Sequence, residues 1–209
     1  SGSIRLARAA TGRQHVIVCG YHGWQDWYIG STTMNRGVPD LTRSLTHVVP
    51  FNDLDTLQTT IDHLAGQVAA VIMEPMTSTW PLDGYLQGVR RITEDNGIVL
   101  VFDEMLTGFR FAPGGAQEYF GVTPDLACFG KALANGFPLS AIVGRRDILD
   151  LMPTIFFSGT FGGETLSLTA ARVVLDRMET GVPTATLAST GGRLLDKIEA
   201  ARPAASRSF

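Results

Sequence analysis

The chain has few cysteines, no long apolar run and no large excess of charge of either sign. Only two of its 209 residues are cysteines, Cys19 and Cys128, and both lie in apolar, strand-like runs. Such positions are typical of buried, reduced thiols, so we expect neither a disulfide nor a metal site. The 17 basic and 20 acidic residues give a net charge of −3, which argues against a surface that binds nucleic acid.

No stretch has the apolar length of a membrane-spanning helix, and the sequence does not open with a signal peptide. We therefore expect a protein that does not enter the membrane and that resides in the cytoplasm. Apolar residues make up 44% of the chain and charged residues 18%. These proportions are those of an ordinary globular protein, and the length allows one sizeable core.

Short apolar runs alternate with stretches of helical periodicity along most of the chain. Strands are predicted over residues 16–19, 69–73, 98–102, 126–129 and 141–143. Helices are predicted over residues 4–9, 57–64, 86–95 and, with a break at 181–183, 164–201. This alternation predicts an α/β fold with three α/β/α layers and a mostly parallel sheet. Residues 26–43 are predicted to form a long loop, and residues 202–209 a frayed tail.

Two residues whose side chains could take part in a reaction follow predicted strands. Lys131 comes after the apolar run 126–129, where an unpaired ammonium would be costly to bury. A lysine there is explained if its amine acts as a neutral nucleophile toward a carbonyl; the alternative is a surface lysine without a chemical role. Asp103 ends the run 98–102 in the same way. A Schiff-base lysine and an aspartate for a pyridinium nitrogen are what pyridoxal 5'-phosphate (PLP) requires of a protein.

The sequence resembles the class III aminotransferases, which are fold-type I PLP enzymes, and within them the glutamate-1-semialdehyde aminomutase-like members. The resemblance rests on segments that occur in the family's order. These are Tyr21–Trp24, Ile72–Pro75, Val101–Arg110, Gly114–Gln117, Gly121–Leu126, Phe129–Pro138 and Ser158–Phe161. The resemblance implies that residues 1–209 form the large PLP-binding domain, without the family's N-terminal segment and C-terminal small domain.

The same resemblance implies an activity. An amino group would move between an amino donor and a carbonyl acceptor, through a lysine Schiff base and quinonoid and ketimine intermediates. Two alternatives remain open. The chain could be a catalytically incomplete domain that folds and dimerises without turnover, or it could catalyse another PLP reaction, such as decarboxylation or racemisation.

The family pattern also implies a role for each of five residues. Lys131 would form the Schiff base and shuttle the proton, and Asp103 would keep the pyridine nitrogen protonated. Tyr21 would stack on the cofactor ring, and His22 would contact cofactor or substrate unless it is a packed loop histidine. Thr160 would reach the phosphate of a neighbouring subunit, which implies a homodimer, unless its glycine-rich turn is only structural. All five are predicted at the carboxyl ends of strands, where ligands of such sheets gather.

Four further features refine this picture. Glu104 is predicted to be structural, and so is Glu74, with an orienting role for Glu74 as second choice. Leu106 stands where many family members have glutamine, which favours the aminomutase-like branch. The turn Ser1-Gly2-Ser3 resembles the family's phosphate-binding turn with residues deleted after it, or else is foreign to the natural protein.

Overall fold

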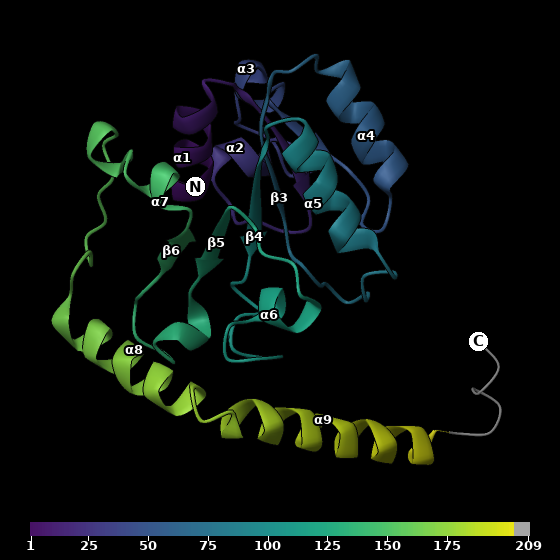
Figure 1. Ribbon diagram of the computed structural model, residues 1–209, viewed down its shortest axis with the longest axis vertical. Helices are drawn as coiled ribbons and strands as arrows, with labels where there is room; N and C mark the ends of the chain where they lie inside the picture. Colours follow the sequence, from purple (N-terminus) through teal and green to yellow (C-terminus); the bar gives the residue numbers. More distant parts are fainter. Residues whose placement is uncertain (203–209) are drawn as a thin grey trace.

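The computed structural model describes residues 1–202, and its centre is a six-stranded sheet (Figure 1). The strands are β1 (His15–Cys19), β2 (Thr46–Val48), β3 (Val68–Met73), β4 (Val99–Asp103), β5 (Leu126–Phe129) and β6 (Ala141–Gly144). Their order is β2-β1-β3-β4-β5-β6, and every pair is parallel except β5 with β6. The predicted α/β class with a mostly parallel sheet is therefore confirmed.

Helices cover the sheet on both faces. One core lies under α4 (Leu54–His63) and α5 (Tyr85–Asp95), and another lies under α1 (Gly2–Thr11) and α7 (Arg146–Leu149). Successive strand residues alternate between the two cores, which is why all six residues of β3 are buried. This double burial explains why the central strands read as continuous apolar runs in the sequence.

The last two helices lie beyond the sheet. α8 (Thr165–Met178) packs against the one-turn 3₁₀ helix η1 (Lys131–Leu133), and α9 (Val182–Ala201) continues as an arm along the end of the molecule (Figure 1). Gly181 separates them with a left-handed φ of 69°, so the predicted break is confirmed. Glu164 caps α8, since its carboxylate accepts hydrogen bonds from the first backbone N–H groups of the helix.

The structure contains short elements that the sequence did not reveal. The predicted loop 26–43 holds the one-turn helices α2 (Asp26–Ile29) and α3 (Asp40–Arg43), and the edge strand β2 follows it. Four further short helices were also missed: α6 (Ala116–Phe120), η1, α7 and the 3₁₀ helix η2 (Met152–Thr154). Elements this short show no periodicity of their own and depend on local capping. Most of the predicted frayed tail, residues 203–209, lies outside the described residues.

Two histidines join the edge strand to its neighbour. Nδ1 of His15 in β1 lies 2.9 Å from Nε2 of His47 in β2. A hydrogen bond between two imidazoles needs one N–H donor and one free lone pair. Burial lowers the pKa of His47, and the adjacent His15 lowers it further. The pair therefore favours a state in which His47 carries no charge.

We expect acid to weaken this pairing. Because the pKa of His47 is lower in the folded chain, its contribution to stability is present above the unfolded pKa of about 6.5 and is lost as the pH falls through the folded value. The test compares urea unfolding midpoints at about pH 7.5 and about pH 5.5. The variant His47→Gln should lose less stability than the wild type, whereas His63→Gln, at an exposed position of α4, should match the wild type. Equal losses in wild type and His47→Gln would contradict the expectation.

Candidate functional site

The carboxyl ends of the parallel strands meet at one edge of the sheet and enclose a cavity of about 290 Å³. Four of the five predicted site residues line it: Tyr21 and His22 after β1, Asp103 at the end of β4, and Lys131 after β5. The strands thus bring together residues that are far apart in the sequence, at the edge where such sheets bind ligands.

Asp103 is held in a fixed orientation. It is 9% exposed, and its Oδ1 accepts a hydrogen bond from the backbone N–H of Met105 at 3.1 Å. Its Oδ2 lies 2.8 Å from Nδ1 of His22, whose Nε2 lies 3.2 Å from the carbonyl oxygen of Cys19. His22 is therefore packed in the loop after β1, and it ties the carboxylate of Asp103 to the end of that strand.

Tyr21 lies on the rim of the cavity. Its side chain is 63% exposed, and its ring meets that of Tyr28 edge to face, with centroids 5.7 Å apart. Its backbone N–H donates to Oε2 of Glu74 at 3.1 Å. Glu74 also lines the cavity, so its carboxylate fixes the backbone of Tyr21 while leaving the aromatic ring exposed.

Lys131 differs from expectation in its exposure. The residue is exposed, not buried, and it opens the helix η1 directly after β5 and Gly130. A Cβ at Gly130 would lie 2.5 Å from the sulfur of Met105, so a larger residue there would have to displace that flexible side chain. Lys131 itself has a left-handed φ of 44°, a conformation that is uncommon outside glycine and that concentrates at functional sites.

Glu104 holds the segment that follows Asp103. It is fully buried, and its carboxylate accepts hydrogen bonds from the hydroxyl of Thr107 at 2.5 Å and from the backbone N–H groups of Ala116 and Gln117 at 3.0 and 2.8 Å. These bonds pin the chain between β4 and α6. The predicted structural role of Glu104 agrees with this geometry.

Thr160, the fifth predicted site residue, does not line this cavity. It is exposed in the glycine-rich turn before α8 and lines a separate, open hollow of about 1180 Å³, together with residues such as Leu139, Phe157 and Arg172. Thr160 therefore does not directly follow a strand, but Leu133 after β5 and Ala141 at the start of β6 line the same hollow, which places the hollow at the carboxyl edge of the parallel strands. Since β6 runs antiparallel, it ends at the opposite edge, and the chain passes through α7 and η2 before it reaches Thr160.

Two serines at the start of the chain also line the cavity. Oγ of Ser1 accepts a hydrogen bond from the indole N–H of Trp27 at 2.8 Å. Oγ of Ser3 is buried and has no hydrogen-bond partner among residues 1–202. Both flank the start of α1, whose N-terminal end carries the positive end of the helix dipole. The sequence signal, a Ser-Gly-Ser turn before an apolar helix, was visible but left two interpretations open.

Cys128 was not predicted as a site residue, yet it lines the same cavity. It is a free, half-buried thiol in β5, whereas Cys19 is free and buried. Burial raises the pKa of Cys128, so its thiol stays protonated near neutral pH and serves as part of the wall.

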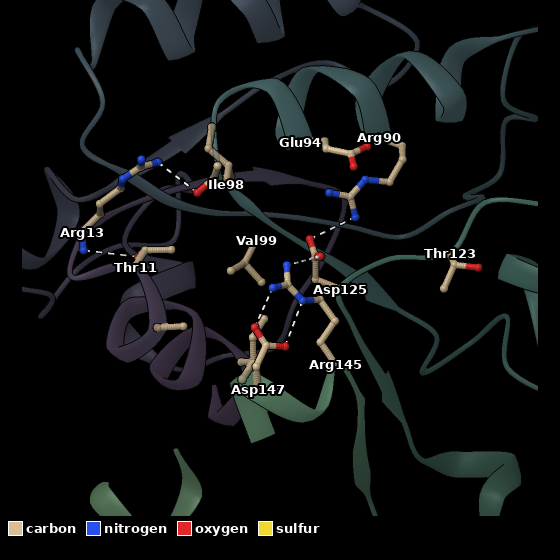
Figure 2. A pocket seen from close by; sticks show the side chains of 13 residues that line it. Thr11, Arg13, Arg90, Glu94, Ile98, Val99, Thr123, Asp125, Arg145 and Asp147 are labelled. Atoms are coloured by element: carbon tan, nitrogen blue, oxygen red, sulfur yellow. Dashed lines mark hydrogen bonds and ion pairs between the residues drawn. The ribbon is translucent and has the colours of Figure 1, made fainter. Parts of the chain in front are cut away.

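A second hollow, of about 610 Å³, lies at the opposite edge of the sheet (Figure 2). Asp125 stands between two guanidinium groups there, 3.0 Å from Arg90 and 3.1 Å from Arg145. Arg145 also pairs with Asp147 at 2.6 Å, and Asp125 accepts the backbone N–H of Leu100. These charges neutralise one another and tie the starts of β4 and β5 to the end of β6, so we assign the cluster a structural role.

Within residues 1–202, no group of three or more His, Cys, Asp or Glu side chains is arranged to hold a metal ion. None of the helices in that same span has both the length and the apolarity needed to cross a membrane.

The chain is similar to known proteins over nearly its whole length. The family model described as aminotransferase class-III matches residues 1–206. A glutamate-1-semialdehyde 2,1-aminomutase of Methanocaldococcus jannaschii is 41% identical over 219 residues, which cover 93% of this chain and 51% of that protein. A protein of the same name from Methanothrix thermoacetophila is 40% identical and covers 86% of this chain and 46% of its own length. The chain thus spans about half the length of these curated relatives.

Solved structures agree with this similarity. The PLP internal aldimine form of the FumI protein from Sphingopyxis sp. MTA144 has a TM-score of 0.89 and 29% identity, and the match covers 95% of this chain and 49% of that one. A glutamate-1-semialdehyde-aminomutase from Pseudomonas aeruginosa has a TM-score of 0.69 and 28% identity, with 85% and 45% covered.

Proposed function

Because this chain belongs to the class III aminotransferase family, we propose that it supplies the cofactor-binding part of a PLP-dependent aminotransferase or aminomutase. One observation carries the proposal: a single cavity joins the amine-bearing Lys131 to a buried, hydrogen-bonded Asp103. Of these two reactions, the names of the relatives favour the aminomutase reaction. The substrates would be a small amino donor and a carbonyl acceptor.

The cavity residues fit PLP, the cofactor of this family. Each carboxylate oxygen of Asp103 already accepts one hydrogen bond and keeps a second lone pair, which a protonated pyridine nitrogen can use. The unpartnered hydroxyl of Ser3 and the N-terminal end of α1 suit an anionic phosphate. When bound, PLP supplies an electron sink for the carbanion formed at the substrate carbon.

Each residue of the chain then has a physical task. Lys131 provides the primary amine that holds the cofactor covalently and, once released, carries a proton to and from the substrate carbon. Asp103 holds a proton at the pyridine nitrogen, and His22 keeps its carboxylate in place. Tyr21 offers a flat ring to cover one face of the cofactor, with its backbone fixed by Glu74.

The visible absorption spectrum of the purified chain tests the proposal. Added PLP should produce the absorption band of a lysine-bound cofactor, and an amino donor should shift it. A band that no donor shifts would support the alternative of a domain without turnover, which the half-length match to the relatives keeps open. A protein that gives no such band would reject the proposal.

The position of Thr160 supports an assembly in which two chains share each site. Thr160 is exposed and lies outside the cavity that holds Lys131, so within one chain it does not line the cofactor cavity. A homodimer in which the glycine-rich turn of one chain reaches the phosphate of the other would give this threonine the role that the family pattern implies.

Replacing Thr160 by alanine is expected to weaken PLP binding by about 1.5–3 kcal/mol, the value of one hydrogen bond to a charged group. The change would be measured as a PLP dissociation constant. Thr169→Ala, which removes a hydroxyl bonded within α8, should leave the constant unchanged and serves as the control.

Mixing chains tests whether the site is shared. In a heterodimer of Lys131→Ala and Thr160→Ala chains, one site pairs an intact Lys131 with the partner's intact Thr160, so its PLP affinity should recover. Heterodimers that show no recovery, or a strictly monomeric protein with full PLP affinity, would reject the shared site.

A further inference from the structure

A fourth cavity, of about 320 Å³, lies between the segment after β4, the helix η1 and the helices α8 and α9. It is smaller than the hollow of Figure 2, and its lining residues are of a different kind. Its apolar lining includes Phe109, Met178 and Leu187, and its polar lining consists of Arg110, Arg177 and Asn135. Small-molecule sites commonly combine a mostly apolar wall with a few polar groups, and here both arginines at the wall are exposed to solvent.

The charge of this cavity is unbalanced. No carboxylate lines it, and within residues 1–202 neither Arg110 nor Arg177 forms an ion pair. This contrasts with Arg90 and Arg145, which share Asp125. Two guanidinium groups without a protein anion, beside an apolar wall, match a ligand that has a carboxylate at one end and a hydrocarbon part at the other.

This cavity shares two walls with the cofactor cavity. Within η1, Lys131 lines the cofactor cavity and the next residue, Ala132, lines this one. In the segment after β4, Met105 lines the cofactor cavity, whereas Phe109 lines this one. Phe109 and Asn135 both have left-handed backbones, with φ of 63° and 46°. Any shift of either segment therefore acts on both cavities.

We propose that this cavity binds an apolar monocarboxylate and that its occupancy changes the affinity of the chain for PLP. The first half stands on the lining and its charge. The second half rests on the proposed function, because it requires PLP in the neighbouring cavity. Coupling of this kind is reciprocal, so PLP must change the affinity for the carboxylate by the same factor.

Calorimetric titration of the PLP-free chain with hexanoate tests the site. Hexanoate should bind saturably at one site per chain, and hexanol, which lacks the charge, should bind much more weakly. Arg110→Gln and Arg177→Gln should each weaken hexanoate binding about tenfold or more. Arg172→Gln is the matched control, because Arg172 is on α8 but lines a different hollow. Absence of saturable binding, or equal affinity of the wild type and both cavity variants, would overturn the site.

The coupling is measured on the same protein. Saturating hexanoate should change the PLP dissociation constant by about fivefold or more, and saturating PLP should change the hexanoate constant equally. An unchanged PLP constant would overturn the coupling. A chain that binds hexanoate but never binds PLP would refute the proposed function and leave the carboxylate site supported, so the two failures are distinguishable.

Discussion

Treatment of the PLP-loaded chain with borohydride is expected to attach the cofactor irreversibly to Lys131 and to no other residue. The sequence offers a sharp test, because it contains only two lysines, Lys131 and Lys197. Lys131 lines the cofactor cavity, whereas Lys197 is exposed on α9 and does not line it. Peptide mapping of the reduced protein should therefore find the label on the peptide that contains Lys131.

The variant Lys131→Ala should lose the borohydride-stable label at this position and any turnover with an amino donor, since no second lysine lines the cavity to replace it. Lys197→Arg keeps the charge of α9 and should label like the wild type. A label on the Lys197 peptide, or undiminished labelling of Lys131→Ala, would remove Lys131 from its proposed role.

The central strands were predicted well because each one is recognisable from its own run of apolar residues. Strands β3 and β4 are covered on both faces, so they read as continuous apolar runs. The direction of β6 could not be predicted in this way, because it depends on which edge of the sheet the chain reaches after η1. For the same reason, the sequence did not reveal that α7 and η2 lie between β6 and Thr160.

In the candidate site, too, local sequence patterns predicted some features, whereas others depend on tertiary packing. Asp103 and Lys131 were predicted because each follows a buried strand, and their shared cavity depends only on the two strands being parallel neighbours. The bond between His22 and Asp103 depends on the strand order β1-β3-β4, which no local pattern reveals. The exposure of Lys131 was not predicted either, because the burial of a residue after a strand depends on how the chain that follows it packs.

Asp103→Asn is expected to bind PLP and yet to react with an amino donor at least about a hundredfold more slowly, which corresponds to about 3 kcal/mol of lost transition-state stabilisation. A neutral amide does not hold a proton at the pyridine nitrogen, so the ring accepts carbanion electrons poorly. The measurement is the rate of the spectral change in a single-turnover reaction with the donor. Asp147→Asn, which alters a carboxylate at the opposite edge of the sheet, should react like the wild type. A near-normal rate in Asp103→Asn would show that this carboxylate does not control the cofactor's electronics.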